Sequence, residues 1–187
     1  PKPLLKWYDT NRRILPWRED PTPYHVWISE IMLQQTRVEA VKPYYDRFMR
    51  ALPGVGALAG AEEEALLKLW EGLGYYNRVR NLQKAAVQIM EEYGGSMPDS
   101  YEELLKLKGI GSYTAGAIAS IAFGKPEPAV DGNVLRVLSR VGRREEDITL
   151  PAVKKAMEDE LRRVMPDRPG AFNQALMEIG ATVCIPN

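Results

Sequence analysis

The sequence is poor in cysteine and histidine, with one of each among its 187 residues. That cysteine, Cys184, excludes an internal disulfide and fits a reducing compartment. Long hydrophobic runs are also lacking, and the most lipid-like stretch, residues 115–123, is too short to cross a bilayer. We therefore expect an intracellular protein. Because the chain starts at Pro1 and stops three residues after Cys184, we also expect a fragment cut from a longer protein.

Net charge is absent as well, since 25 basic side chains balance 25 acidic ones. A neutral chain is not drawn to nucleic acid by bulk attraction, but unevenly spread charge can still form a local phosphate-binding patch. Two basic clusters and two lysines near a glycine turn are candidates for such a patch. They are Arg78, Arg80 and Lys84, then Arg136, Arg140, Arg143 and Arg144, with Lys106 and Lys108. Solvated helix faces are the alternative.

Strand-like alternation is missing too, whereas nearly every segment spaces its apolar residues as a helix does. We therefore expect an all-α protein. Thr22 and Pro23 supply a cap and a first-turn proline for one of these helices. Pro53-Gly54-Val55-Gly56 is interpreted as a plain connection between helices. A short helix is predicted around residues 4–8, another from Glu62 to a break at residues 72–76, and a third over residues 79–90. Further helices are predicted near residues 24–36, 38–50, 100–107, 112–123, 131–142, 150–164 and 169–183.

Gly109 and Gly111 flank one apolar residue directly before a predicted helix of small residues. Glycine lets the backbone approach another molecule closely, and the amides that open a helix lack internal partners and can bind a phosphate. The pattern predicts a helix-hairpin-helix that holds DNA by its backbone and reads no base. An ordinary glycine turn is the alternative, which the two glycines alone would favour.

Two carboxylates stand out as candidates for catalysis. Glu30 lies within an apolar helix beside Trp27 and Leu33, and burial favours the protonated form that a general acid needs. A solvated glutamate, or one paired with Arg18, is the alternative. Asp131 opens a predicted helix, where aspartate is a common N-cap. Fixed there, it could also stabilise the positive charge on a sugar that is losing its base.

Several blocks of this sequence closely resemble the catalytic region of MutY-type adenine DNA glycosylases, in the helix-hairpin-helix, endonuclease III-like superfamily. The resemblance covers essentially the whole chain, and the blocks occur in the family's order. They are Trp17-Arg18, residues 29–36 (SEIMLQQT), residues 72–76 (GLGYY), residues 109–116 (GIGSYTAG) and residues 130–134 (VDGNV).

The resemblance implies two helical lobes with a DNA cleft between them. Residues 23–125 would form a six-helix barrel that carries the hairpin. Residues 1–22 and 126–187 would form the second lobe, truncated before most of the iron-sulfur loop. The family's C-terminal domain, which recognises 8-oxoguanine, would be absent.

The implied reaction is hydrolysis of the N-glycosidic bond of adenine mispaired with 8-oxoguanine or guanine, after the nucleotide is flipped out. By motif position, Glu30 resembles the acid that protonates adenine at N7 and later handles water. Asp131 resembles the carboxylate that stabilises the sugar cation or forms a transient glycosyl bond with it. Tyr113 and Asn133 resemble residues that support Asp131. The positions implied to contact DNA or the base are Trp17, Arg18, Leu33, Gln34, Gln35, Thr36, Tyr75, Gly109, Gly111 and Thr114; of these, Gln35 and Tyr75 match residues that wedge into the base stack.

Tyr113 stands where strand-cleaving relatives carry the lysine that forms a Schiff base, so a monofunctional glycosylase is implied. No cofactor is expected to be required for the chemistry. The carbonyls of Leu105, Leu107 and Ile110 resemble a hairpin cation site. Cys184 matches the first of four cysteines that hold a [4Fe-4S] cluster, and the other three are missing, so the chain alone is not expected to bind the cluster.

The implied partner is double-stranded DNA containing adenine opposite 8-oxoguanine or guanine. A monomer without membrane contact is expected, located with DNA in the cytoplasm or nucleoid if the source is bacterial. A mismatch thymine glycosylase and a non-catalytic DNA-binding fragment are the alternatives. Gln34-Gln35-Thr36 and Asp131-Gly132-Asn133 favour adenine, and the presence of both Glu30 and Asp131 favours catalysis.

Overall fold

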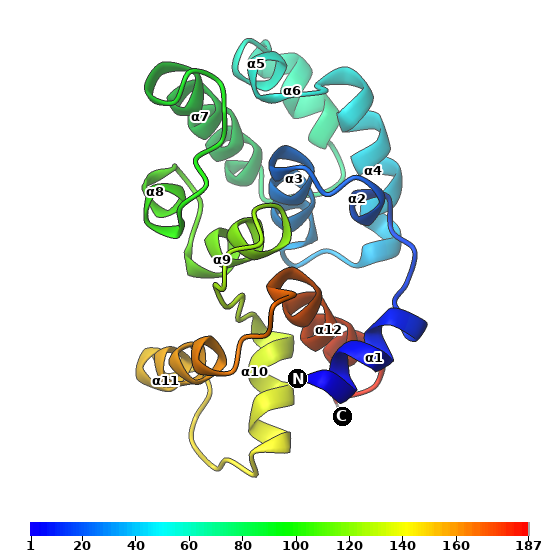
Figure 1. The fold of residues 1–187 in the computed structure, drawn as a ribbon. Helices are drawn as coiled ribbons and strands as arrows, with labels where there is room; N and C mark the ends of the chain where they lie inside the picture. The colour runs from blue at the N-terminus through cyan, green and yellow to red at the C-terminus, as the bar shows by residue number, and fades with distance from the viewer. Residues whose placement is uncertain (187) are drawn as a thin grey trace. The chain divides into compact units, whose positions relative to one another are not determined.

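Residues 1–186 are described by the computed structural model, and every regular element within them is a helix (Figure 1). The predicted all-α class is confirmed. None of the helices in these residues has the length and apolar character needed to span a bilayer. In chain order the helices are α1 (Lys2–Asn11), α2 (Pro16–Glu19), α3 (Pro23–Leu33), α4 (Val38–Ala51), α5 (Val55–Ala59), α6 (Glu63–Trp70), α7 (Asn77–Glu92), α8 (Tyr101–Lys106), α9 (Ser112–Ile121), α10 (Gly132–Val141), α11 (Pro151–Arg163) and α12 (Pro169–Thr182).

Several helices begin where the sequence supplies a cap or a first-turn proline. Thr22 accepts a hydrogen bond from the His25 amide at 3.2 Å, and Ser100 accepts one from the Glu103 amide at 3.1 Å. Each satisfies an amide that has no partner inside its helix. Proline occupies the first turn of α1, α2, α3, α11 and α12, where its missing N–H removes no hydrogen bond.

The helices predicted from the sequence differ from the structure at three places. The short helices α2 and α5 were not predicted, and the segment interpreted as a plain connection at Pro53–Gly56 instead starts α5, with Gly54 as its N-cap. α5 forms because Val55 and Leu58 bury their side chains and the helix packs against α7. α3 ends at Leu33, before the predicted end at Thr36, because Gln35 has a left-handed φ of 60°.

The described chain divides into two compact units. One unit is Ile14–Thr114, and the other combines residues 1–13 with residues 115–186. The domain boundaries implied by the resemblance, after residues 22 and 125, stay a prediction. In the first unit α3 is the central helix, since eight of its eleven residues are buried. Phe48 and Trp70, both fully buried, meet edge to face beside it in the same core, with ring centroids 6.0 Å apart.

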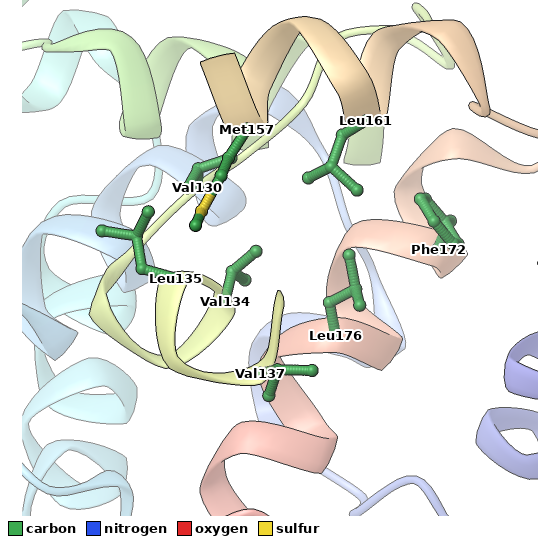
Figure 2. Packing of buried hydrophobic residues seen from close by; sticks show 8 residues of the cluster. All are labelled: Val130, Val134, Leu135, Val137, Met157, Leu161, Phe172 and Leu176. Atoms are coloured by element: carbon green, nitrogen blue, oxygen red, sulfur yellow. The ribbon is translucent and has the colours of Figure 1, made fainter. Parts of the chain in front are cut away.

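The second unit has its own hydrophobic core between α10, α11 and α12. Figure 2 shows this core, in which Val134 and Val137 of α10 face Leu161 of α11 and Leu176 of α12. The full set is Val130, Val134, Leu135, Val137, Met157, Leu161, Phe172 and Leu176. α1 packs against α12 in this unit, so the N-terminal helix completes a core built mainly from the C-terminal part of the chain. Burial of these side chains supplies the main driving force for the packing.

The segment that leads to Asp131 is held by two unusual contacts within the second unit. A Cβ atom at Gly116 of α9 would lie 2.0 Å from the Pro128 carbonyl oxygen, so only glycine allows this approach. Asn173 of α12 is fully buried and accepts a hydrogen bond from the Ala129 amide at 3.2 Å. Its amide group donates to Ser120 Oγ and to the Glu127 carbonyl, both at 2.8 Å. The segment is therefore fixed before Asp131 is reached.

Candidate active site

Glu30 is buried in the first unit, with 7% of its surface exposed. It lies on α3, whose neighbouring positions are almost all apolar and buried, as the sequence indicated. The Tyr113 hydroxyl, from the first turn of α9, donates a hydrogen bond to Glu30 Oε2 at 2.5 Å. Tyr113 was expected to support Asp131, whereas this contact links it to Glu30. The bond orients the Glu30 carboxyl group, and a positioned carboxyl group can serve as a general acid or base.

Asp131 is the N-cap of α10 in the second unit. Its Oδ1 accepts a hydrogen bond from the Val134 amide at 2.8 Å, and its Oδ2 accepts one from Asn133 Nδ2 at 2.9 Å. The expected support of Asp131 by Asn133 is therefore seen as a direct contact. Capping and catalysis do not exclude each other here, because a carboxylate oxygen can accept more than one hydrogen bond.

Arg136 fixes the orientation of Asn133. Its Nη2 donates to Asn133 Oδ1 at 2.8 Å and to the Gly180 carbonyl at 2.7 Å, while its Nε donates to the Cys184 carbonyl at 2.9 Å. Since Asn133 Oδ1 accepts from Arg136, its amide nitrogen faces Asp131. Arg136 thus binds protein groups, and its place in a phosphate-binding patch stays a prediction. The spacing of charged residues along the sequence does not predict that Arg136 orients Asn133.

Two other arginines of the second cluster, Arg140 and Arg144, also bind protein groups. Arg140 Nη1 donates to the Ile185 carbonyl at 2.8 Å and to Cys184 Sγ at 3.3 Å. Arg144 forms an ion pair with Glu160. In the first cluster Arg80 pairs with Glu63 at 2.9 Å. The predicted phosphate footprint is thus reduced mainly to residues near the hairpin.

Gln35 and Tyr75, the two predicted wedge residues, share an uncommon backbone conformation. Their φ angles are 60° and 49°, in the left-handed region that side chains other than glycine rarely adopt. Both side chains are exposed, Tyr75 to 67%. Thr36, close to Gln35, donates from Oγ1 to the Gln34 carbonyl at 3.4 Å. These residues lie on two short loops, one after α3 and one before α7.

The remaining predicted contact residues differ in how much surface they expose. Trp17 is 6% exposed and meets Tyr45 edge to face, with ring centroids 5.3 Å apart. Arg18 and Leu33 are half-buried. Thr114 is only 2% exposed, which leaves almost none of its surface for a partner molecule. Trp17 and Thr114 thus act first as core residues of this unit.

α8 and α9 are joined by a turn over residues 107–111, so a pair of helices around a glycine turn is present as predicted. Gly109 has a φ of 81°, and a Cβ atom there would lie 2.9 Å from Asn81 Cβ. Gly111 has open space around its Cα. Of the carbonyls proposed for a cation, that of Leu107 already accepts a hydrogen bond from the Ile110 amide at 3.1 Å. Lys108, beside Gly109, is an exposed cation at this turn.

A small recess of about 70 Å³ opens in the first unit between α3, α7 and the hairpin. Its lining residues are Trp27, Ile31, Gln34, Arg78, Asn81, Leu82, Lys108 and Gly109. Two buried nitrogens of these residues, Trp27 Nε1 and Arg78 Nε, have no hydrogen-bond partner among the described atoms. The recess therefore suits a group that accepts hydrogen bonds, such as water or a phosphate oxygen.

The described residues do not fit an iron-sulfur cluster. Such a cluster is held by several cysteine thiolates, and the sequence contains Cys184 alone. Within residues 1–186 no group of three or more histidine, cysteine, aspartate or glutamate side chains is placed to hold a metal ion.

Comparison with known proteins places these features in a family. The model of the HhH-GPD superfamily base excision DNA repair proteins matches residues 28–164. The chain is 50% identical to adenine DNA glycosylase of Mus musculus and 49% identical to that of Homo sapiens, and each alignment covers 98% of the chain. It covers 38% and 35% of those proteins, and 52% of a 41% identical adenine DNA glycosylase of Buchnera aphidicola.

Solved structures agree with this assignment. The structure of a thermostable thymine-DNA glycosylase matches with a TM-score of 0.89 and 30% identity, covering the whole of this chain and 86% of that one. A non-covalent endonuclease III–DNA complex matches with a TM-score of 0.82 and 25% identity, covering 98% of this chain and 84% of the other. The chain thus spans about a third to a half of the adenine glycosylases it resembles, and it belongs to the HhH-GPD superfamily of base excision DNA repair proteins.

Proposed function

We propose that this chain is the catalytic region of a monofunctional DNA glycosylase that removes adenine mispaired with 8-oxoguanine or guanine. The observation that carries the proposal is the buried Glu30 carboxyl group, held at 2.5 Å by Tyr113. The names of the 50% and 49% identical relatives support adenine as the base. The partner is double-stranded DNA, and the protein acts as an intracellular monomer, in the cytoplasm or nucleoid if bacterial.

In the proposed reaction Glu30 donates its proton to the flipped adenine at N7. The electron pair of the bond between the sugar C1′ and N9 moves onto the base, which leaves as neutral adenine. The sugar becomes an oxocarbenium ion, and Asp131 stabilises its positive charge. Water then attacks C1′ and gives its proton to Glu30, which restores the acid. Asn133 keeps one oxygen of Asp131 hydrogen-bonded throughout.

Tyr113 supports base removal without strand cleavage. Formation of a Schiff base with the sugar requires an amine, and a phenol cannot supply one. The short bond to Glu30 instead gives Tyr113 a role in orienting the acid. Borohydride trapping of a covalent complex that depends on residue 113 would contradict this assignment.

DNA binding is proposed to use the hairpin, two wedges and a base pocket. Gly109 and Gly111 bring backbone amides and a possible cation, bound by the carbonyls of Leu105, Leu107 and Ile110, to the phosphates. Gln35 and Tyr75 enter the base stack, and Gln34 and Thr36 lie near the opposing purine. Trp17, Arg18 and Leu33 line the pocket for the flipped adenine. The left-handed backbone of the exposed Gln35 and Tyr75 supports the wedge assignment.

A mismatch thymine glycosylase is the second candidate. It is favoured by the 30% identity to a thymine-DNA glycosylase over 86% of that chain, with a TM-score of 0.89. Both candidates share the fold, so fold alone does not separate them. A DNA-binding fragment without catalysis is the third possibility, and it predicts binding without product.

One assay separates the three functions. The protein is incubated with duplexes that contain A opposite 8-oxoguanine, A opposite G, or T opposite G, and abasic sites are then cleaved with alkali. Product from the two adenine duplexes supports the proposal, and product from T opposite G alone overturns it. Glu30→Gln should abolish excision and keep binding, whereas Glu39→Gln, at an exposed glutamate paired with Lys42, should change neither.

A further inference from the structure

Arg78 of α7 binds five backbone carbonyl oxygens with the two ends of one guanidinium group. Its Nη1 donates to the carbonyls of Ile31, Met32 and Gln34 at 2.9, 3.3 and 2.6 Å. Its Nη2 donates to those of Leu73 and Gly74 at 3.0 and 3.2 Å. The same group therefore ties the end of α3 to the loop that precedes α7.

The carbonyls bound by Nη1 lie at the C-terminal end of α3, where helix carbonyls lack hydrogen-bond donors. The last carbonyls of α3 have no amide ahead of them within the helix, and a cation beside them also suits the helix dipole. α3 carries Glu30, one to four residues before these carbonyls. Burial lowers the pKa of Arg78 from its ordinary value, yet guanidinium remains charged at neutral pH. Arg78 thus caps the helix that holds the candidate acid.

Each of the two loops places a left-handed residue directly after a carbonyl that Arg78 binds. Gln35, with a φ of 60°, follows Gln34, and Tyr75, with a φ of 49°, follows Gly74. The Tyr75 ring centroid also lies 5.5 Å from the guanidinium carbon. A left-handed backbone is unfavourable for both residue types and persists only where surrounding contacts impose it. Arg78 supplies such a contact to both loops at once.

We propose that Arg78 is a positioning residue that sets the spacing and backbone conformation of the Gln35 and Tyr75 loops, so that the two side chains enter the base stack as one preformed pair. This inference rests on the proposed function, in which these residues are wedges. Lysine cannot replace arginine in this role, because its single ammonium group offers three donors and cannot reach both loops in one plane. The effect is on opening of the base stack and not on the chemistry at Glu30.

The test compares Arg78→Lys with Arg50→Lys, which makes the same change at an exposed arginine on α4 whose Nε donates to the Asp46 carbonyl. Duplexes carry 2-aminopurine beside the mispaired adenine, because its fluorescence rises when the stack opens. Arg78→Lys should slow this rise and adenine excision by about tenfold or more, the factor expected when a strained backbone loses its support. Arg50→Lys should match the wild type. A normal fluorescence rise in folded Arg78→Lys refutes the inference.

A double-mutant cycle shows whether Arg78 acts through the wedges. In a protein that already carries Gln35→Ala and Tyr75→Ala, adding Arg78→Lys should change excision by less than about twofold, because coupled residues are not additive. A full tenfold loss in that background means that Arg78 acts elsewhere. If the wild type excises neither adenine nor thymine, the proposed function is rejected. The fluorescence measurement still tests the role of Arg78 in that case.

A second pair of variants covers the case in which Arg78→Lys does not fold. Gly74 and Gly94 both have left-handed φ angles, 70° and 61°, and neither has an atom within 4 Å of an added Cβ. Gly74→Ala should slow stack opening, because it strains the loop that Arg78 holds. Gly94→Ala places the same strain at the end of α7 and should leave opening unchanged. Equal effects of the two substitutions would refute the proposal.

Discussion

Replacing Asn173 by leucine should destabilise the second unit markedly. The side chain is fully buried, and leucine has the same branched shape with two bulkier methyl groups in place of the polar oxygen and nitrogen. The change leaves the Ala129 amide and the Glu127 carbonyl without their present partner. Ser120 Oγ keeps a weaker contact to the Ala117 carbonyl at 3.4 Å and is not counted as lost.

The magnitude follows from these two groups. A buried polar group without a partner costs about 1–3 kcal/mol, and the apolar leucine recovers part of that loss, so a net cost of about 3 kcal/mol is expected. For a chain of this length, that corresponds to a fall of roughly 6–12 °C in the melting temperature. Excision should fall as well, because the loosened segment leads directly to Asp131.

Circular dichroism at 222 nm during heating measures the effect. Gln174→Leu is the matched control, since its amide donates only to the Gly170 carbonyl of its own helix at 3.2 Å among the contacts described. That variant should melt close to the wild type, as expected for a partly exposed position. If Asn173→Leu melts within about 2 °C of the wild type, its three hydrogen bonds do not hold this segment and the reasoning fails.

Three further outcomes are expected. Tyr113→Phe removes the bond to Glu30 and should slow single-turnover excision by about tenfold or more while DNA binding, followed by fluorescence anisotropy, stays within about twofold. Arg136→Met should slow excision through Asn133 and Asp131 without changing affinity, and an unchanged rate would remove Arg136 from that chain of contacts. Arg168 lowers the pKa of Asp9 through their hydrogen bonds. This ion pair therefore stabilises the fold above the usual aspartate pKa, and the stabilisation is lost as pH falls through the lowered value. Asp9→Asn should show a smaller drop in melting temperature than the wild type between pH 7 and about pH 3.

Most of the fold could be predicted because it depends on local patterns. Helical spacing of apolar residues, caps such as Thr22 and prolines in first turns all act within a few residues. The burial of Glu30 also followed from its apolar neighbours along α3. What the pattern missed are α2 and α5, which are too short to show a period and form because tertiary packing buries their side chains.

The errors in the site have a common physical origin. Arg78 and Arg136 were read as surface charges, yet each guanidinium binds carbonyls 44 or more residues away in the sequence. The left-handed turn at Gln35 directly follows a carbonyl bound by Arg78, a contact that local sequence does not reveal. The bond between Tyr113 and Glu30 joins positions 83 residues apart, which no spacing rule connects. Sequence patterns name the chemical groups, whereas long-range hydrogen bonds decide where those groups point.

Cys184 gives this protein a built-in attachment point for a spectroscopic probe. It is the only thiol in the chain, so a maleimide dye or spin label would react at one place without any mutagenesis. Its carbonyl accepts a hydrogen bond from Arg136, and its sulfur accepts one from Arg140. A label there would sit at the end of the hydrogen-bonded chain that reaches Asp131. Changes in its signal on adding DNA would therefore report on the surroundings of this carboxylate.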